Sequence, residues 1–219
     1  MGILHKNNLS EDSLLGVWKI TETFNDLFSQ VNLNSDETTI LNNFSNNKRK
    51  IEWLCTRLLL KELTNSDLKI IYNEEGKPYL DNNFYNISIS HSKSLVSIIL
   101  SKNSKVGIDI EEISDKIERV INKFLSKTEQ NTIVKDNLRL FHLYLCWSAK
   151  EALYKVFSED KLNFIENISI MSFQPKNSGI FYAKVIINEL ADTYALSYEL
   201  IDNNVLVWSI FFSSAVSSL

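Results

Sequence analysis

Two short segments of the chain together carry three carboxylates and a lysine. Asp109 and Glu111 lie two residues apart in a segment that alternates like a β-strand, so their side chains point to the same face, and we expect the intervening Ile108 and Ile110 to face the core. Glu151 and Lys155 lie four residues apart in a segment with helical spacing, so they share one side of a helix. Carboxylate oxygens are ligands that Mg²⁺ prefers, and a phosphate supplies further ones. The two segments therefore indicate magnesium-assisted phosphate chemistry.

Each pair also has an ordinary structural explanation. Asp109 and Glu111 could form a solvated acidic strand end, although two unpaired carboxylates this close repel, which makes a cation between them physically sensible. A Glu and a Lys four residues apart form a common surface ion pair on helices, worth a few tenths of a kcal/mol. Apolar neighbours such as Trp147 favour a half-buried helix here. On that helix we expect Lys150 to face solvent.

The elements that must position these residues follow from the hydrophobic periodicity. In the first part of the chain we expect a strand at 15–20, helical structure over 37–63 with a break near 42–47, a strand at 67–72, and a hairpin made of 84–90 and 95–100. In the second part we expect a strand at 105–111, a capping box formed by Ser126 and Glu129, a long amphipathic helix over 138–157, and strands at 168–173, 180–187, 195–201 and 205–212. This pattern predicts an α/β (α+β) fold.

The composition excludes several classes of protein. With 219 residues, 44% hydrophobic and 23% charged, the chain is typical of a soluble globular protein, and its net charge of -4 argues against a nucleic-acid binder. The polar N-terminus predicts no signal peptide, and no apolar run approaches the ~20 residues of a membrane span. Cys55 and Cys146 are expected to be core thiols in a reducing compartment, and the three histidines are too dispersed for a zinc site. We therefore expect a cytoplasmic protein without membrane or nucleic-acid partners.

Five blocks in the chain resemble, in the expected order, the signature of the 4'-phosphopantetheinyl transferases. They read GKPYL (76–80), ISISHS (87–92), GIDIE (107–111), KFLSKTE (123–129) and WSAKEALYK (147–155). The chain length resembles the long, monomeric, surfactin-synthetase-activating type. The resemblance implies two similar α/β halves, residues 1–103 and 104–219, related by a pseudo-twofold axis, with the metal motifs in the second half and the active site in the cleft between the halves.

The resemblance also implies an activity and its residues. A transferase of the holo-[acyl-carrier-protein] synthase type moves 4'-phosphopantetheine from coenzyme A to a serine of an apo acyl or peptidyl carrier protein, with Mg²⁺ as the cofactor and Mn²⁺ as a possible substitute. In this chain the metal ligands would be Asp109, Glu111 and Glu151, the catalytic residues Glu151 and Lys155, and the coenzyme A contacts Lys77, Ser90, His91, Arg49 and Lys155.

Several alternatives stay open at this point. The general base could be Glu151, Lys155 or a metal-bound water. The segment 31–39 contains no basic residue, so it lacks the cations with which the family holds the 3'-phosphate of coenzyme A. Lys123 and Lys127 could complement an acidic carrier domain. Two rival functions also remain, namely another magnesium-dependent phosphotransferase or nucleotide hydrolase, and a non-enzymatic interaction module with the same fold.

Overall fold

Two antiparallel sheets, each packed against a helix of 18 residues, make up most of the protein. The computed structural model describes residues 2–157 and 162–211. Contacts divide the chain into two units, Met1–Lys102 and Asn103–Leu219. The mixed α+β class expected from the sequence is confirmed, and each unit is described by itself below.

The first unit contains a four-stranded antiparallel sheet in the order β1-β2-β6-β5. Its strands are β1 (Ile3–Ser10), β2 (Ser13–Lys19), β5 (Asn86–His91) and β6 (Leu95–Ser101). The pairing of β5 with β6 confirms the expected hairpin. A separate two-stranded sheet joins β3 (Ile70–Tyr72) to β4 (Pro78–Leu80). The strand β1 was not expected from the sequence. It is an exposed strand at the sheet edge, so it lacks the apolar alternation that marks a half-buried strand.

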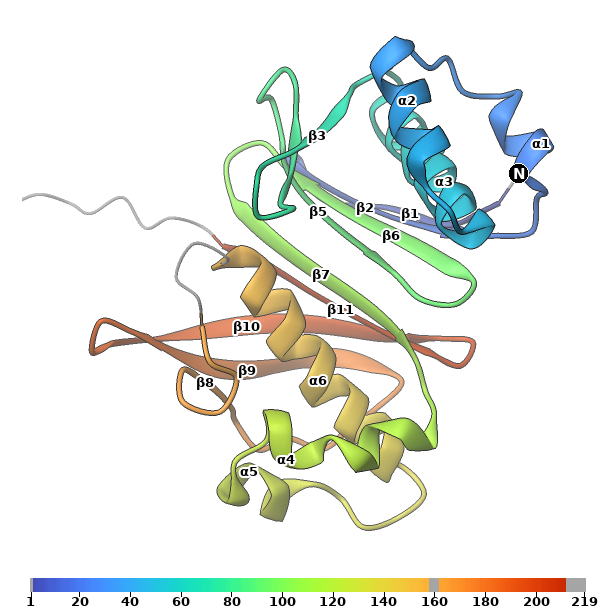
Figure 1. Cartoon of the computed structure of the whole chain (residues 1–219). Coiled ribbons are helices and arrows are strands. Elements are labelled where there is room, and N and C mark those ends of the chain that lie inside the picture. Colours follow the sequence, from blue (N-terminus) through green and yellow to red (C-terminus); the bar gives the residue numbers. More distant parts are fainter. Residues whose placement is uncertain (1, 158–161, 212–219) are drawn as a thin grey trace, which may run out of the picture. The chain divides into compact units, whose positions relative to one another are not determined.

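The helices of this unit are α1 (Phe24–Phe28), α2 (Ser35–Asn43) and α3 (Asn47–Thr64). The expected break between α2 and α3 is confirmed. Phe44 ends α2 with an extended backbone, and the Asn46 side chain accepts the backbone N–H of Lys48 to begin α3. Helix α3 packs against β2 and β6, and its apolar side buries Leu54, Cys55 and Leu59 almost completely. Figure 1 shows α3 lying beside this sheet, in blue-green.

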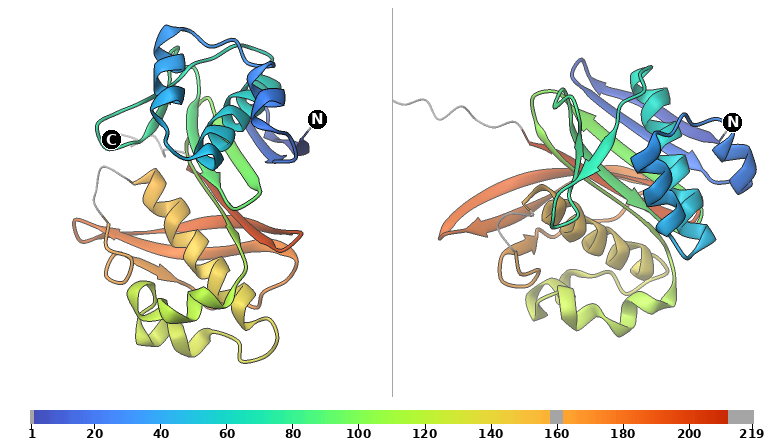
Figure 2. Two further views of the ribbon diagram at one scale, coloured as in Figure 1. Left: turned by 45° about the vertical axis from the view of Figure 1, so that its right-hand side comes forward. Right: turned by 45° about the horizontal axis from the view of Figure 1, so that its top comes forward.

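The second unit contains a five-stranded antiparallel sheet in the order β7-β11-β10-β9-β8. Its strands are β7 (Lys105–Glu112), β8 (Ile168–Ile170), β9 (Ser178–Ile187), β10 (Leu190–Ile201) and β11 (Asn204–Phe211). All five expected strands of this region are confirmed, although β8 ends at Ile170 and the last residue of the expected strand 205–212 lies outside the described residues. The expected long helix is also confirmed as α6 (Arg139–Val156), which crosses one face of the sheet (Figures 1 and 2).

Shorter helices follow β7 in the sequence. They are η1 (Asp115–Arg119), α4 (Ile121–Phe124) and α5 (Lys127–Thr132). The expected capping box is confirmed, because Ser126 accepts the backbone N–H of Glu129 while the Glu129 carboxylate accepts the backbone N–H of Ser126. Within residues 2–157 and 162–211, no helix is both long and apolar enough to cross a membrane.

Candidate active site

Gly107 has no side chain, which lets helix α6 approach strand β7 very closely. A Cβ atom on Gly107 would lie 2.1 Å from the carbonyl oxygen of Ala152 and 2.7 Å from Cγ2 of Val156. Only glycine fits such a distance, so Gly107 sets the spacing between strand and helix. The alternate residues Ile108 and Ile110 are fully buried, as expected, which fixes the opposite face of the strand. The sequence blocks GIDIE and WSAKEALYK therefore meet because of this glycine.

The contact between strand and helix joins Asp109 to Lys155. The Lys155 ammonium donates hydrogen bonds of 2.9 Å to Oδ1 of Asp109 and 2.9 Å to the carbonyl oxygen of Ile108. The Asp109 side chain is 5% exposed and that of Lys155 is 28% exposed, so the pair lies at the edge of the core. A charged ammonium lies against Asp109 at this position, and the Lys155 side chain as a whole is partly exposed.

Glu111, two residues further along β7, is half-buried and bound by an aromatic side chain. The indole Nε1–H of Trp147 donates to Oε1 of Glu111 over 3.2 Å. Burial, with repulsion from Asp109 and Glu151, raises the pKa of Glu111 to about 7, and the bond from Trp147 opposes this shift. Burial and repulsion from Asp109 likewise raise the pKa of Glu151, while Lys155 opposes it. The three carboxylates therefore interact electrostatically.

This donor set suits a hard divalent cation, although it is not preassembled around one. In the described part of the chain, no three side chains among His, Cys, Asp and Glu are grouped closely enough to hold a metal ion as they stand. Asp109 contacts Lys155 instead. Three acidic groups that repel one another and offer only oxygen atoms would be relieved by Mg²⁺, because an ion between them removes the repulsion. The residues therefore fit such an ion in chemistry, and to bind it they would have to move from the positions that the structure shows.

The expectation that Lys150 faces solvent is wrong. The residue is completely buried, and its ammonium donates to Oε1 of Glu129 at 2.8 Å and to the carbonyl oxygens of Phe164 and Ile168 at 2.7 Å each. A buried ammonium needs such partners because its desolvation is costly. Burial lowers its pKa, while Glu129 opposes that shift. Lys150 thus has a structural environment quite unlike that of Lys155.

In the first unit, the structure brings Arg49 of α3 and His91 of β5 together. A guanidinium nitrogen of Arg49 is hydrogen-bonded to Nε2 of His91, and the buried carboxylate of Glu52 lies 3.5 Å from Arg49 and 4.0 Å from His91. Arg49 and His91 both line a cavity of about 150 Å³, together with Trp53, Thr56, Tyr72, Gly76, Pro78 and Ile89. Two of the residues expected to contact coenzyme A thus line the same cavity.

Two further expected contacts, Lys77 and Ser90, are sequence neighbours of residues that line this cavity, whereas Lys155 lies in the second unit, bound to Asp109. Lys77 lies between Gly76, which has a left-handed backbone (φ +82°), and Pro78, and its backbone N–H donates to Oδ1 of Asn73 at 2.8 Å. Ser90 precedes His91 on β5 and is buried at 8% exposure. Neither residue lines the cavity itself.

Several residues that shape these sites were not assigned by the sequence analysis. The bond from Trp147 to Glu111 depends on a contact between residues 36 positions apart, which no local pattern reveals. Glu52 follows Lys48 and Arg49 by four and three residues, so helical spacing could have predicted its ion pairs of 3.5 Å with both. Gly107 is visible in the sequence as an interruption of an apolar strand, which is a known sign of close backbone approach.

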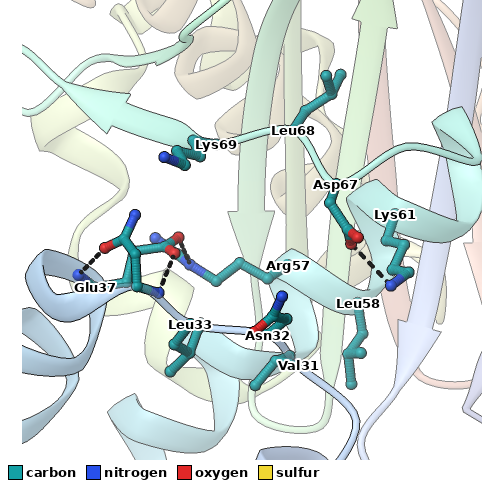
Figure 3. Close-up of a pocket in the computed structure, with 11 residues that line it drawn as sticks. Val31, Asn32, Leu33, Glu37, Arg57, Leu58, Lys61, Asp67, Leu68 and Lys69 are labelled. Carbon is teal, nitrogen blue, oxygen red and sulfur yellow. Dashed lines mark hydrogen bonds and ion pairs between the residues drawn. The ribbon is translucent and has the colours of Figure 1, made fainter.

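A larger cavity of about 240 Å³ lies elsewhere in the first unit, beside α3 (Figure 3). The buried guanidinium of Arg57 donates to Glu37 at 3.2 Å and stacks on the ring of Trp53, while Lys61 pairs with Asp67 at 2.8 Å. These four charged groups neutralise one another. Lys69, which also lines the cavity, adds a fifth charged side chain.

The sequence comparisons agree with the geometry of the second unit. Residues 105–207 match the sequence model of the 4'-phosphopantetheinyl transferase superfamily. This segment of the chain belongs to that superfamily. It contains Asp109, Glu111, Glu151 and Lys155, whereas the Arg49 and His91 pair lies outside it.

Individual transferases match about half of the chain. The 4'-phosphopantetheinyl transferase AcpT of Salmonella typhi is 29% identical over 114 residues, which cover 49% of this chain and 58% of that protein. The AcpT protein of Escherichia coli (strain K12) is 28% identical over 113 residues, or 49% of this chain and 57% of its own. The transferase gsp of Aneurinibacillus migulanus is 30% identical over 112 residues, or 49% and 46% respectively. The alignments thus span about half the length of these curated relatives.

Proposed function

We propose that this protein is a magnesium-dependent 4'-phosphopantetheinyl transferase that modifies a serine of an apo carrier protein, with coenzyme A as the donor. The observation that carries the proposal is the junction of β7 and α6. There Lys155 contacts Asp109 at 2.9 Å, with the mutually repelling carboxylates of Glu111 and Glu151 nearby. The superfamily match over residues 105–207 supports the same reaction.

The reaction exchanges one phosphorus–oxygen bond for another. The serine hydroxyl oxygen forms a bond to the phosphorus that carries the pantetheine arm, and the bond from that phosphorus to the adenosine half of coenzyme A breaks. The leaving group is adenosine 3',5'-bisphosphate, and the serine proton passes to a base. Phosphoryl transfer of this kind depends mainly on positioning and on stabilising negative charge.

Asp109, Glu111 and Glu151 would hold Mg²⁺, and the bound ion would offset the charge of the diphosphate. Lys155 is suited to a phosphate oxygen, because its side chain is partly exposed and has a flexible stem. A carboxylate that binds Mg²⁺ through one oxygen keeps a second oxygen, so Glu151 could both hold the ion and accept the serine proton. We therefore favour Glu151 as the general base over Lys155, whose ammonium is already protonated in its pair with Asp109.

The cavity of the first unit would bind the nucleotide part of coenzyme A. Arg49 and His91 offer hydrogen-bond donors to a phosphate, and the ring of Trp53 lines the same cavity. The indole Nε1–H of Trp53 is buried and has no hydrogen-bond partner among the described residues. Lys77 and Ser90, beside this cavity, stay proposed contacts on the basis of sequence alone.

The acidic carrier would meet the region around α4 and α5. Lys123, at the end of α4, and Lys127, in the first turn of α5, both carry exposed side chains there. Opposite charges on the two partners would speed their encounter and set their orientation.

The test is to incubate the protein with coenzyme A, Mg²⁺ and a panel of apo carrier proteins, and to measure the mass of each carrier by mass spectrometry. The proposal predicts that at least one carrier gains the mass of one phosphopantetheine arm, and that the gain disappears with the variant Asp109→Asn or with a serine-to-alanine carrier. Release of adenosine 3',5'-bisphosphate without any change in carrier mass would instead support a nucleotide hydrolase. Absence of both would support an interaction module.

A further inference from the structure

A chain of contacts connects the buried Lys150 to the proposed metal ligand Glu111. Two of the three hydrogen bonds of Lys150 hold the segment that follows α6 in sequence, through the carbonyl oxygens of Phe164 and Ile168 at 2.7 Å each. The third bond goes to Glu129, which also accepts the backbone N–H of Ile170 at 3.0 Å. Lys150 thus fixes the backbone at Phe164 against helix α6.

The ring of Phe164 continues the chain. It packs edge-on against the indole of Trp147, with ring centroids 5.8 Å apart. On another side, Phe124 packs edge-on against the same indole at 5.2 Å. An indole held between two rings has little freedom to rotate, and such contacts are directional. The position of Phe164 therefore determines where the Nε1–H of Trp147 points.

That N–H donates to Oε1 of Glu111 at 3.2 Å. Groups that hydrogen-bond a metal ligand from outside set its orientation, and their loss commonly weakens metal affinity 10- to 100-fold. We propose that Lys150 is a positioning residue for the metal site, acting through Phe164 and Trp147 to orient the carboxylate of Glu111. This proposal rests on the proposed function in that it takes Glu111 as a ligand of the divalent cation.

The two lysines of the WSAKEALYK block, Lys150 and Lys155, therefore have different roles in this proposal. Lys155 is partly exposed and bound to Asp109, where a substrate phosphate can reach it. Lys150 is completely buried, and its three partners saturate the three N–H bonds of an ammonium, so that it cannot contact a substrate. The effect of Lys150 on the reaction must therefore be indirect.

One test observes Trp147 directly in the metal-free protein. The chain contains four tryptophans, so an ¹⁵N correlation spectrum should show four indole N–H signals, and the variant Trp147→Phe identifies the one of interest. We expect Lys150→Met and Phe164→Leu each to shift or broaden the Trp147 signal while the signals of Trp18 and Trp53 stay in place. An unmoved Trp147 signal in a folded Lys150→Met protein would overturn the proposal, whatever the activity of the protein is.

A second test measures the binding of Mn²⁺ in the presence of coenzyme A by electron paramagnetic resonance. Trp147→Phe keeps a ring but removes the N–H donor, so we expect a loss of affinity of about tenfold. Lys150→Met should cause a similar loss, and the double variant should lose no more than either single one, because the two residues act in series. Additive losses would contradict the proposed route.

Controls separate positioning from general destabilisation. Tyr154→Leu removes a second aromatic side chain that packs against Phe164, with ring centroids 5.8 Å apart. Tyr154 is not part of the chain of contacts from Lys150 to Glu111. This variant should leave Mn²⁺ affinity within about twofold of the starting protein. If Lys150→Met fails to fold, Phe164→Leu tests the same chain, because it retains the backbone carbonyl that Lys150 binds. Failure of the starting protein to bind Mn²⁺ would count against the proposed function, whereas the spectrum of Trp147 would still decide the route.

Discussion

The substitution Gly107→Ala tests how precisely strand β7 and helix α6 must be spaced. The added Cβ would lie 2.1 Å from the Ala152 carbonyl oxygen, whereas ordinary contacts begin at 3.4 Å, so that the backbones must separate by about 1.3 Å. The obstructing atom belongs to the helix backbone and cannot rotate away. Because Ala152 directly follows Glu151 in α6, the movement would carry the proposed base away from Asp109.

The expected consequences are a loss of stability and a loss of turnover. Overpacking of this kind costs about 1–3 kcal/mol and occasionally more. We place Gly107→Ala near the upper end of this range, and a displacement of about 1 Å in an active site lowers turnover on the order of 100-fold. The KM for coenzyme A should change much less, because the nucleotide contacts that we propose lie in the first unit. Urea unfolding and a steady-state carrier-modification assay measure the two effects.

The matched control is Gly16→Ala, on strand β2 of the first unit. There the added Cβ would meet side-chain methyl groups, Leu59 Cδ1 at 2.8 Å and Leu63 Cδ2 at 2.9 Å, which can move. We expect a smaller loss of stability and a turnover within a few-fold of the starting protein. If Gly107→Ala retained full turnover, or cost no more stability than Gly16→Ala, the close approach of β7 and α6 would not govern the site.

Three further predictions concern single side chains. Glu151→Gln should lower kcat at least 100-fold, because we assign this residue to the proton transfer. The Kd for coenzyme A, measured by calorimetry, should change much less. Unchanged turnover would remove Glu151 from that role. Arg49→Met should raise the KM for coenzyme A about tenfold. Its control, Lys48→Met, removes the neighbouring partner of Glu52 and should leave this KM nearly unchanged. Equal effects of the two variants on the KM would argue against the nucleotide cavity. Burial lowers the pKa of His142 in the folded protein, so the unfolded chain binds a proton at this residue more readily. Stability should therefore fall as the pH drops below about 6.5, by at most about 1.4 kcal/mol per pH unit. His142→Gln should flatten this part of the stability curve in urea titrations, and an unchanged slope would show that another group is responsible.

The sequence predicted the elements that carry local patterns. Strand β7 and helix α6 were expected within one or two residues of their observed bounds, because alternation and helical spacing are strong over both segments. The same patterns placed Ile108 and Ile110 in the core. Strand β1 was missed because it is mostly exposed at the sheet edge, where alternation is weak.

Contacts between distant residues could not be predicted in this way. Lys150 looked like a surface lysine beside Glu151, and only the positions of Glu129, Phe164 and Ile168 show why it is buried. The bond between Trp147 and Glu111 depends in the same way on the packing of α6 against β7. The local pattern identifies which residues carry charge, whereas the tertiary fold decides which of those charges are accessible to a substrate.

The central claim is that Asp109, Glu111 and Glu151 bind one divalent cation together with coenzyme A. The most direct measurement is the stoichiometry and affinity of Mn²⁺ binding in the presence of coenzyme A, for the starting protein and for Asp109→Asn, Glu111→Gln and Glu151→Gln. We predict one bound ion per chain, and a loss of affinity of about tenfold or more in each of the three variants. Binding that survives all three substitutions, or no binding by the starting protein, would contradict the claim.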